Sequence, residues 1–422
     1  MNRGSFLALA ARGVEAAVMV LAMALVVVRT DAAEQGLFVS FLGFGGVLGL
    51  FDFGLSYSCL LVASQQAATG AGARLGAFRA LALRLGTATA CLGMVAVGLF
   101  GAFLMARAAP ADQWLAPWCV FLACAGLAQV LALRLAVHEG AVSVAAAWSV
   151  RLVQEVLGGV ALVVALLAGL GLWGIAAWAA LRLAVVLAWS IAGRSAPAVP
   201  RLGVRARFDL VAWRREIWPF QWKVGISGIT AFLIFRSMPL IILAVRGPED
   251  AGRFGLSLAI VNMVLGVTTV WPYSQVRPIA ALMTAGAIDR VLALARRITV
   301  LSVALVFAAG VAFIALQWLA IERGWNVAAR MGDPETNAWL MAAALIHQGT
   351  ACWAVVVRAE RQDPMLPLSI FGGLALIGAI VYAAHGTDLR DVAIANFIVT
   401  LAGIPFVWWV LRQFLAPRSA PA

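Results

Sequence analysis

The chain has 422 residues, of which 64% are hydrophobic and only 12% are Asp, Glu, Lys or Arg, and its mean hydropathy is +0.97. Soluble domains have about 45–50% apolar and about 25% charged residues, so this composition excludes an ordinary soluble globular protein. The net charge of +12 is spread over short segments and is not gathered on a soluble domain, so it does not indicate nucleic-acid binding.

Continuous apolar runs of about 20 residues, the length that spans a bilayer as a helix, recur along the whole chain. A β-barrel would require alternating patterns instead, and a spanning segment must satisfy its own backbone hydrogen bonds. The sequence therefore predicts an all-α polytopic membrane protein with about 12 transmembrane helices. We expect the spans near 6–28, 37–63, 79–104, 115–137, 143–168, 171–193, 217–245, 253–274, 291–316, 337–357, 365–384 and 392–414.

The connections between these spans differ in their arginine content. If the N-terminus is cytoplasmic, the inside connections carry an excess of arginine, whereas most outside arginines lie among acidic residues. Because positive charge favours the cytoplasmic side, both termini are predicted to be cytoplasmic. The longest inside connection, 194–216, contains Pro197, Pro200 and several arginines. It divides the chain into a six-helix lobe (1–193), a basic cytoplasmic linker (194–216) and a second six-helix lobe (217–422).

A short pattern recurs at corresponding places in the two halves. Arg29 is followed by an acidic turn and Gly36-Leu37-Phe38, and Arg246 is followed by an acidic turn and Gly252-Arg253-Phe254. The recurrence indicates a duplication. Six spans per half make the two copies parallel, related by an axis along the membrane normal, with binding expected between the halves near the midplane.

These motifs, together with LFDFGLS at Leu50–Ser56 and the long stretch from Phe220 to Ile260, resemble the polysaccharide-transporter branch of the MOP flippase superfamily. Its relatives include O-antigen and lipid II flippases and the multidrug MATE exporters. The matching residues are Gly36, Phe38, Ser40, Asp52, Phe53, Gly54, Gly252 and Phe254. The relatives often carry an acidic residue late in the seventh helix, where this chain has Phe235-Arg236-Ser237 instead.

Charged residues inside the predicted spans are the candidate site residues. Each costs about 2.5–3.5 kcal/mol at a helix centre, so such residues must line water, pair with one another or reach an interface. The candidates for a cavity that binds substrate are Arg12, Glu15, Asp52, Arg151, Glu155, Arg182 and Arg236.

The spacing of these candidates suggests different roles for them. Arg12 with Glu15, and Arg151 with Glu155, lie three and four residues apart, so each couple is expected to meet on one helix face. Asp52 either caps a helix, bridges to a neighbouring helix, or faces a wet interior or a buried cation, for which Arg12 and Arg182 are the candidates. Arg182 and Arg236 have no acidic residue near them in the sequence, so both are expected to line a cavity.

An arginine-rich cavity suits an anion such as pyrophosphate. Together with the resemblance, it implies a flippase that moves polyprenyl-pyrophosphate-linked oligosaccharide, such as an O-antigen, capsule or exopolysaccharide repeat unit, across the bacterial inner membrane by alternating access. We expect a monomeric transporter and no enzyme, with no cofactor, metal or nucleic acid. A polysaccharide polymerase and glycosyltransferases are the candidate protein partners. The alternatives are a MATE-like drug or cation antiporter, a membrane enzyme of glycan assembly, and a scaffold that binds glycan lipids.

Overall fold

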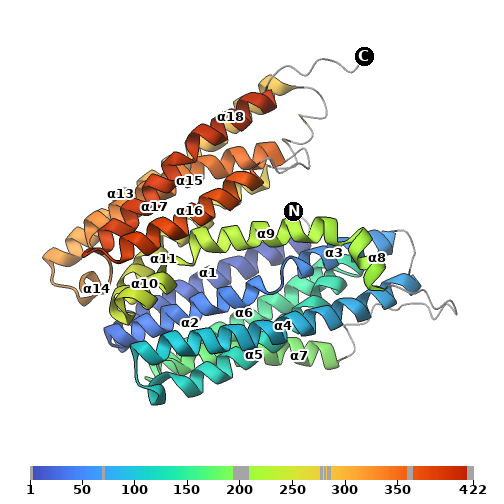
Figure 1. Cartoon of the computed structure of the whole chain (residues 1–422), viewed down its shortest axis with the longest axis horizontal. Coiled ribbons are helices and arrows are strands. Elements are labelled where there is room, and N and C mark those ends of the chain that lie inside the picture. The colour runs from blue at the N-terminus through green and yellow to red at the C-terminus, as the bar shows by residue number, and fades with distance from the viewer. Residues whose placement is uncertain are drawn as a thin grey trace. The chain divides into compact units, whose positions relative to one another are not determined.

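The computed structural model describes residues 3–68, 72–192, 209–275, 279, 282, 287–358 and 365–415, and every regular element in these ranges is a helix (Figure 1). The helices are α1 (Arg3–Arg29), α2 (Ala32–Leu50), α3 (Leu55–Ala68), α4 (Gly72–Ala108), α5 (Ala111–Ala141), α6 (Val144–Leu167), α7 (Trp173–Ile191), α8 (Leu210–Glu216), α9 (Trp218–Phe235), α10 (Met238–Arg246), α11 (Pro248–Ser274), α13 (Ile288–Glu322), α14 (Asn326–Ala329), α15 (Pro334–Arg358), α16 (Leu366–Ala384), α17 (Leu389–Ala402) and α18 (Ile404–Leu415).

Eleven spans in the described part of the chain are long and apolar enough to cross a membrane. The predicted span that is missing from this set is the seventh, 217–245, because it is divided into α9 and α10. Pro239 lies in the first turn of α10 and cannot donate a backbone hydrogen bond to α9, which explains the break. The predicted helix layout is therefore confirmed, except that the second, seventh and twelfth spans are interrupted helices.

The chain forms two compact units, Met1–Phe232 and Leu233–Ala422, called here the N-terminal and C-terminal units. The predicted linker 194–216 lies outside the described residues up to position 208, and its end is helix α8. Trp213 of α8 stacks on Phe78 of α4 with 5.6 Å between ring centroids. The last part of the predicted linker therefore belongs to the core of the N-terminal unit.

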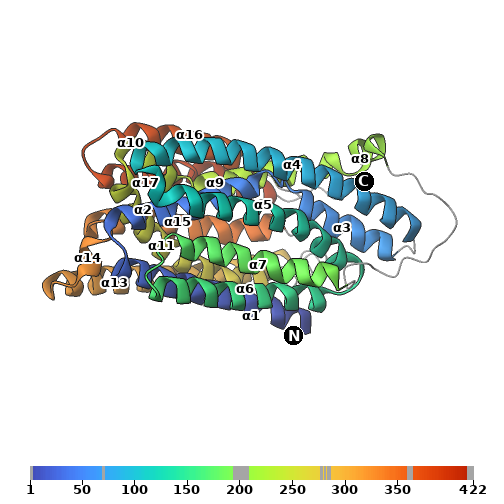
Figure 2. The same ribbon diagram turned by 90° about the horizontal axis from the view of Figure 1, so that it is seen from below.

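In the N-terminal unit, α6 lies between α1 and α7 (Figure 2). Gly159 allows the close approach of α1, because a Cβ atom added at this position would lie 2.4 Å from Cγ2 of Val18. Small residues at helix contacts are the usual means of close packing where no hydrophobic effect drives helices together. Helix α6 therefore contacts both α1 and α7, and the candidate site is built from residues on these three helices.

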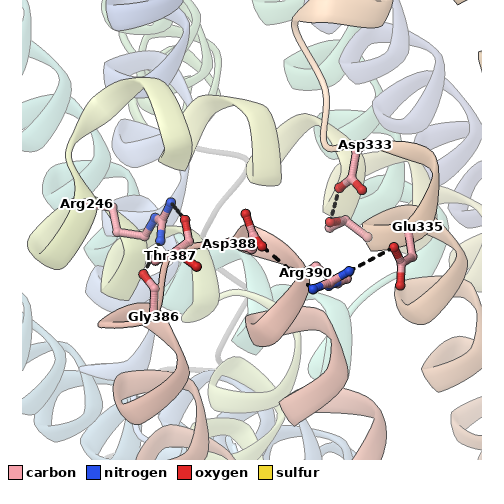
Figure 3. Close-up of polar contacts among 8 residues, drawn as sticks. Arg246, Asp333, Glu335, Gly386, Thr387, Asp388 and Arg390 are labelled. Carbon is pink, nitrogen blue, oxygen red and sulfur yellow. Dashed lines mark hydrogen bonds and ion pairs between the residues drawn. The ribbon is translucent and has the colours of Figure 1, made fainter.

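The structure gives the repeated sequence pattern a matching contact in each unit. Arg29, at the end of α1, donates from Nη1 to the carbonyl oxygen of Leu167, 3.3 Å away, at the start of the α6–α7 connection. Arg246, at the end of α10, donates to the carbonyl oxygens of Gly386 (2.6 Å) and Thr387 (2.9 Å) in the α16–α17 connection (Figure 3). In each unit the arginine that ends the first span holds the connection between the fifth and sixth spans. The repeated sequence pattern thus corresponds to a repeated interaction.

Residues 317–336, which lie between the predicted spans 291–316 and 337–357, are partly helical in the structure. Helix α13 continues to Glu322, and both Gln317 and Thr336 are buried. The Gln317 amide donates to the carbonyl oxygen of Gly332 over 2.6 Å, and Asn337 donates to Oε1 of Gln317 over 2.8 Å. These buried hydrogen bonds join the end of α13 to the start of α15, whereas residues 321–326 between them are exposed.

Replacing Arg246 with alanine should destabilise the C-terminal unit by about 1.5–3 kcal/mol, because it removes charge-assisted hydrogen bonds from a largely covered guanidinium. The side chain of Arg246 is only 17% exposed, and it also pairs with Asp250 at 2.6 Å. Thermal unfolding of the purified protein measures the effect. Arg390→Ala is the matched control, because that arginine pairs with Glu335 and Asp388 in an exposed position (Figure 3). Equal losses for the two variants would contradict the assignment.

Candidate functional site

The candidate site is built around an ion pair between two transmembrane helices. Arg182 lies near the middle of the 19-residue α7, and Glu155 lies near the middle of the 24-residue α6. Nη2 of Arg182 is 2.7 Å from Oε1 of Glu155, and the two side chains are 30% and 10% exposed. The carboxylate is thus covered, whereas the guanidinium still reaches the surface of the N-terminal unit.

The surroundings of Arg182 fix its position. Its guanidinium lies 4.4 Å from the ring centroid of Trp178, one helical turn earlier, in a cation–π contact. Gln154 of α6 donates to the Arg182 carbonyl oxygen over 2.9 Å. Gly158 leaves room for the side chain, since a Cβ atom there would lie 2.8 Å from Cγ of Arg182. The indole Nε1 of Trp178 is buried and has no hydrogen-bond partner among the described residues.

Helix α1 adds a second charge pair next to the first. Nη1 of Arg12 is 2.8 Å from Oε2 of Glu15, and their side chains are 70% and 35% exposed. Both charges act electrostatically on Glu155. The expected Arg12–Glu15 couple is therefore present. With Arg182 and Glu155 it forms a group of two cations and two anions. The charges of this group therefore balance, whereas the sequence predicts a cavity with an excess of arginine.

The expected couple of Arg151 with Glu155 is wrong. Nη1 of Arg151 is 2.6 Å from Oε2 of Glu139, near the end of α5, and its guanidinium lies 4.5 Å from the ring centroid of Trp148. Glu155 pairs with Arg182 instead, which has no acidic residue near it in the sequence. In both pairs a neighbouring helix offers the arginine a carboxylate that sequence spacing cannot reveal. We treat Arg151 and Glu139 as a structural pair.

Asp52 does not meet Arg12 or Arg182 in an ion pair. Its carboxylate accepts hydrogen bonds from Ser56, from the backbone nitrogen at 3.0 Å and from the hydroxyl at 2.8 Å. It therefore caps the start of α3, where the first backbone N–H groups lack partners within the helix. Of the roles considered for Asp52, the structure shows local capping.

The turn that follows Asp52 explains the FDFG sequence. Phe53 and Gly54 have φ angles of +42° and +73°, a backbone conformation that glycine adopts most readily. A Cβ atom at Gly54 would lie 3.0 Å from the carbonyl oxygen of Gln221 in α9, and Phe53 stacks on Trp218 with 5.9 Å between centroids. The break between α2 and α3 thus lets the chain pack closely against α9.

Arg236 lies in the exposed break between α9 and α10, in the C-terminal unit. No ion pair joins it to another residue in the described ranges. The hydroxyl of the next residue, Ser237, donates to the carbonyl oxygen of Leu233 over 2.6 Å and so satisfies a backbone group at the break. Arg236 is therefore a cation at a helix interruption, and its role as a cavity residue stays a prediction.

Sequence reasoning missed five residues that shape these pairs: Glu139, Trp148, Gln154, Gly158 and Trp178. The tryptophans had a detectable signal, because Trp148 precedes Arg151 by three residues and Trp178 precedes Arg182 by four, which places each ring on the arginine's face of the helix. The other residues act from a neighbouring helix, so spacing along one helix gives no indication of them.

No protein-family model and no curated protein sequence matches the chain. Solved structures do match. One is an inward-facing multidrug resistance MATE family transporter of the MOP superfamily, with a TM-score of 0.73 and 13% identity over 98% of this chain and 100% of that chain. The outward-facing conformation of such a transporter matches with a TM-score of 0.59 and 15% identity, over 99% of this chain and 96% of that chain.

A third match is a MOP superfamily transporter from Pyrococcus furiosus, for which a reversed polarity of the binding pocket suggests a different function. Its TM-score is 0.54 at 14% identity, over 97% of this chain and 95% of that chain. The chain is thus an all-α, multi-pass membrane protein. More particularly, it has the fold of the MATE transporters of the MOP superfamily along nearly its whole length, as its sequence motifs predict.

Replacing Asp52 with asparagine should leave stability within about 0.5 kcal/mol, because Asn caps helices about as well as Asp, whereas Asp52→Ala should cost about 0.5–2 kcal/mol. Thermal unfolding of both variants tests this expectation. A large loss for Asp52→Asn equal to that of Asp52→Ala would show that the negative charge itself is required, and a capping role would then be insufficient.

Replacing Gly158 with alanine should cost about 1–3 kcal/mol by overpacking, since the new methyl group would displace the side chain of Arg182. Gly13→Ala is the control, because a Cβ atom at Gly13 meets nothing within 4 Å. We expect Gly13→Ala to be neutral or slightly stabilising, since Ala is the better helix former. Thermal unfolding again provides the measurement, and a loss at Gly13 that matches the loss at Gly158 would contradict the packing argument.

Proposed function

We propose that this protein is a flippase that moves polyprenyl-pyrophosphate-linked oligosaccharide across the bacterial inner membrane by alternating access of its two units. The observation that carries the proposal is the position of Arg182. Its guanidinium lies over the ring of Trp178 at mid-span, and its side chain remains 30% exposed. A planar guanidinium can bind two phosphate oxygens at once and stays charged when partly desolvated. The MATE-like fold supports transport, and the resemblance of the sequence motifs supports the cargo.

In this proposal Arg182 and Arg236 bind the pyrophosphate or an acidic glycan. Arg12, which is 70% exposed beside the central pair, is the first arginine available to help them. Arg151 is left out because Glu139 and Trp148 hold it at a different place in the unit. A membrane enzyme of glycan assembly would be expected to carry its catalytic residues on a large loop. Residues 317–336 are instead partly helical, which supports a transporter over such an enzyme.

A MATE-like antiporter of drugs or cations is the second candidate, and Glu155 favours it. A carboxylate that is only 10% exposed at mid-span is a group that a cationic substrate could approach. The MOP transporter with reversed pocket polarity supports the view that this fold accepts pockets of either sign. We favour an anionic cargo because the guanidinium, and not the carboxylate, is the more accessible partner of the central pair.

The double variant Arg182→Gln, Arg236→Gln should reduce export by about tenfold or more, because it removes charged hydrogen-bond donors to the cargo. Mass spectrometry of polyprenyl-pyrophosphate glycans, with a membrane-impermeant sugar probe to assign the leaflet, should show complete repeat units accumulating on the cytoplasmic face.

Arg151→Gln is the matched control and should export normally if it inserts. Export at the unmodified level by the double variant would overturn the proposed role of the two arginines. Unchanged glycan lipids in cells that lack the protein would overturn the flippase function itself, and drug and ion uptake would then test the antiporter.

A further inference from the structure

We propose that Glu155 is a built-in substitute for the cargo anion: it pairs with Arg182 when the site is empty and is displaced from it when cargo binds. The inference rests on the proposed function and adds a role in the return step of transport. Glu155 is a positioning residue here, because it acts on the cargo through Arg182.

The geometry supports an exchange of partners. Glu155 contacts one guanidinium nitrogen, Nη2, at 2.7 Å, while the guanidinium is partly exposed and presents further donors. The buried Nε1 of Trp178 is another donor beside it without a partner among the described residues. An arriving phosphate therefore meets the exposed part of the Arg182 side chain first and can then compete with the carboxylate for Nη2, while the buried indole N–H of Trp178 is a donor that it reaches only on entering the site.

The charges around the pair show why a substitute is useful. The groups that face Glu155 are Arg182 from α7 and Arg12 with Glu15 from α1, and on the α5 side Glu139 is occupied by Arg151. With Glu155 in place the four charges of the central group cancel. Without cargo and without Glu155, Arg182 would be an unpaired cation at mid-span, which is costly in a low-dielectric interior. The carboxylate thus keeps the empty site neutral, so that the empty transporter can reorient.

The chain offers a matched control for this inference. Glu139 and Arg151 form the same kind of pair, with a distance of 2.6 Å, side-chain exposures of 10% and 27% and a tryptophan under the arginine. In that pair, however, the carboxylate is also bound by the indole of Trp148, whose Nε1 donates to Glu139 over 2.9 Å. Glu139→Gln therefore tests the loss of an equivalent ion pair outside the proposed site.

The experiment uses the full-length protein in liposomes that contain a polyprenyl pyrophosphate with nitrobenzoxadiazole on its sugar. Dithionite, which does not cross the bilayer, bleaches the dye that reaches the outer leaflet. Flipping is measured with and without unlabelled polyprenyl pyrophosphate in the outer leaflet. This lipid can occupy the site during the return step, so that the transporter does not have to reorient with an empty site. Binding of the same probe is measured in detergent.

Glu155→Gln should bind the probe about 5- to 150-fold more tightly, the usual range of coupling between two competing ligands, because Arg182 has lost its internal competitor. Its net flipping should fall by about tenfold or more and should recover when unlabelled lipid is supplied in the outer leaflet. The unmodified protein and Glu139→Gln should show neither effect. Glu155→Gln with unmodified affinity, or with slow flipping that outer-leaflet lipid does not restore, would overturn the inference.

Two further variants keep the test decisive. Glu155→Asp withdraws the carboxylate by one methylene but keeps the charge. This variant should bind the probe more tightly, and its flipping should not depend on outer-leaflet lipid. Unchanged affinity would overturn the inference even if Glu155→Gln does not fold.

Arg182→Gln separates the two proposals. Undiminished probe binding in this variant would overturn the proposed function, whereas weakened binding together with unmodified behaviour of Glu155→Gln would overturn only the role of Glu155.

Discussion

The rest of this structure depends on the cost of leaving a polar or charged group unsatisfied in hydrocarbon. Backbone groups meet this constraint by forming helices, and charged side chains meet it by pairing across helix contacts. Arg182 with Glu155 and Arg151 with Glu139 are the clearest cases. The same constraint explains the interruptions, where Asp52 and the hydroxyl of Ser237 satisfy groups that the broken helices leave open.

The two units satisfy backbone carbonyl groups at their span ends in the same way. In each, an arginine at the end of the first span holds backbone carbonyl oxygens of the connection between the fifth and sixth spans. Each unit thereby fixes its own connections by internal contacts, as the proposed movement of the units would require. Within the described ranges the pair of Arg182 with Glu155 joins two mid-span charges, whereas the ion pairs of the C-terminal unit lie at the ends of spans, so the two halves differ in their interior chemistry.

The paired arginines also change how the arginine-rich composition is understood. Counting charges along the sequence suggests a cationic cavity, whereas the central group of the N-terminal unit is balanced. In the proposed function an anionic cargo competes with Glu155 for Arg182. Recognition of cargo and neutrality of the empty site would then be properties of one pair of side chains, and the difference in exposure between guanidinium and carboxylate would set which of them meets the cargo.

The sequence by itself determined the fold class, nearly every span and the repeat around Arg29 and Arg246, because hydrophobic run length and local motifs are properties of the chain alone. It also determined which residues carry the intramembrane charges. Only the tertiary structure decided their partners: Arg151 meets Glu139 and not Glu155, and Asp52 meets Ser56 and not an arginine. The reason is physical, since a charge in hydrocarbon pairs with whichever opposite group helix packing brings nearest, and that choice is made between helices far apart in the sequence.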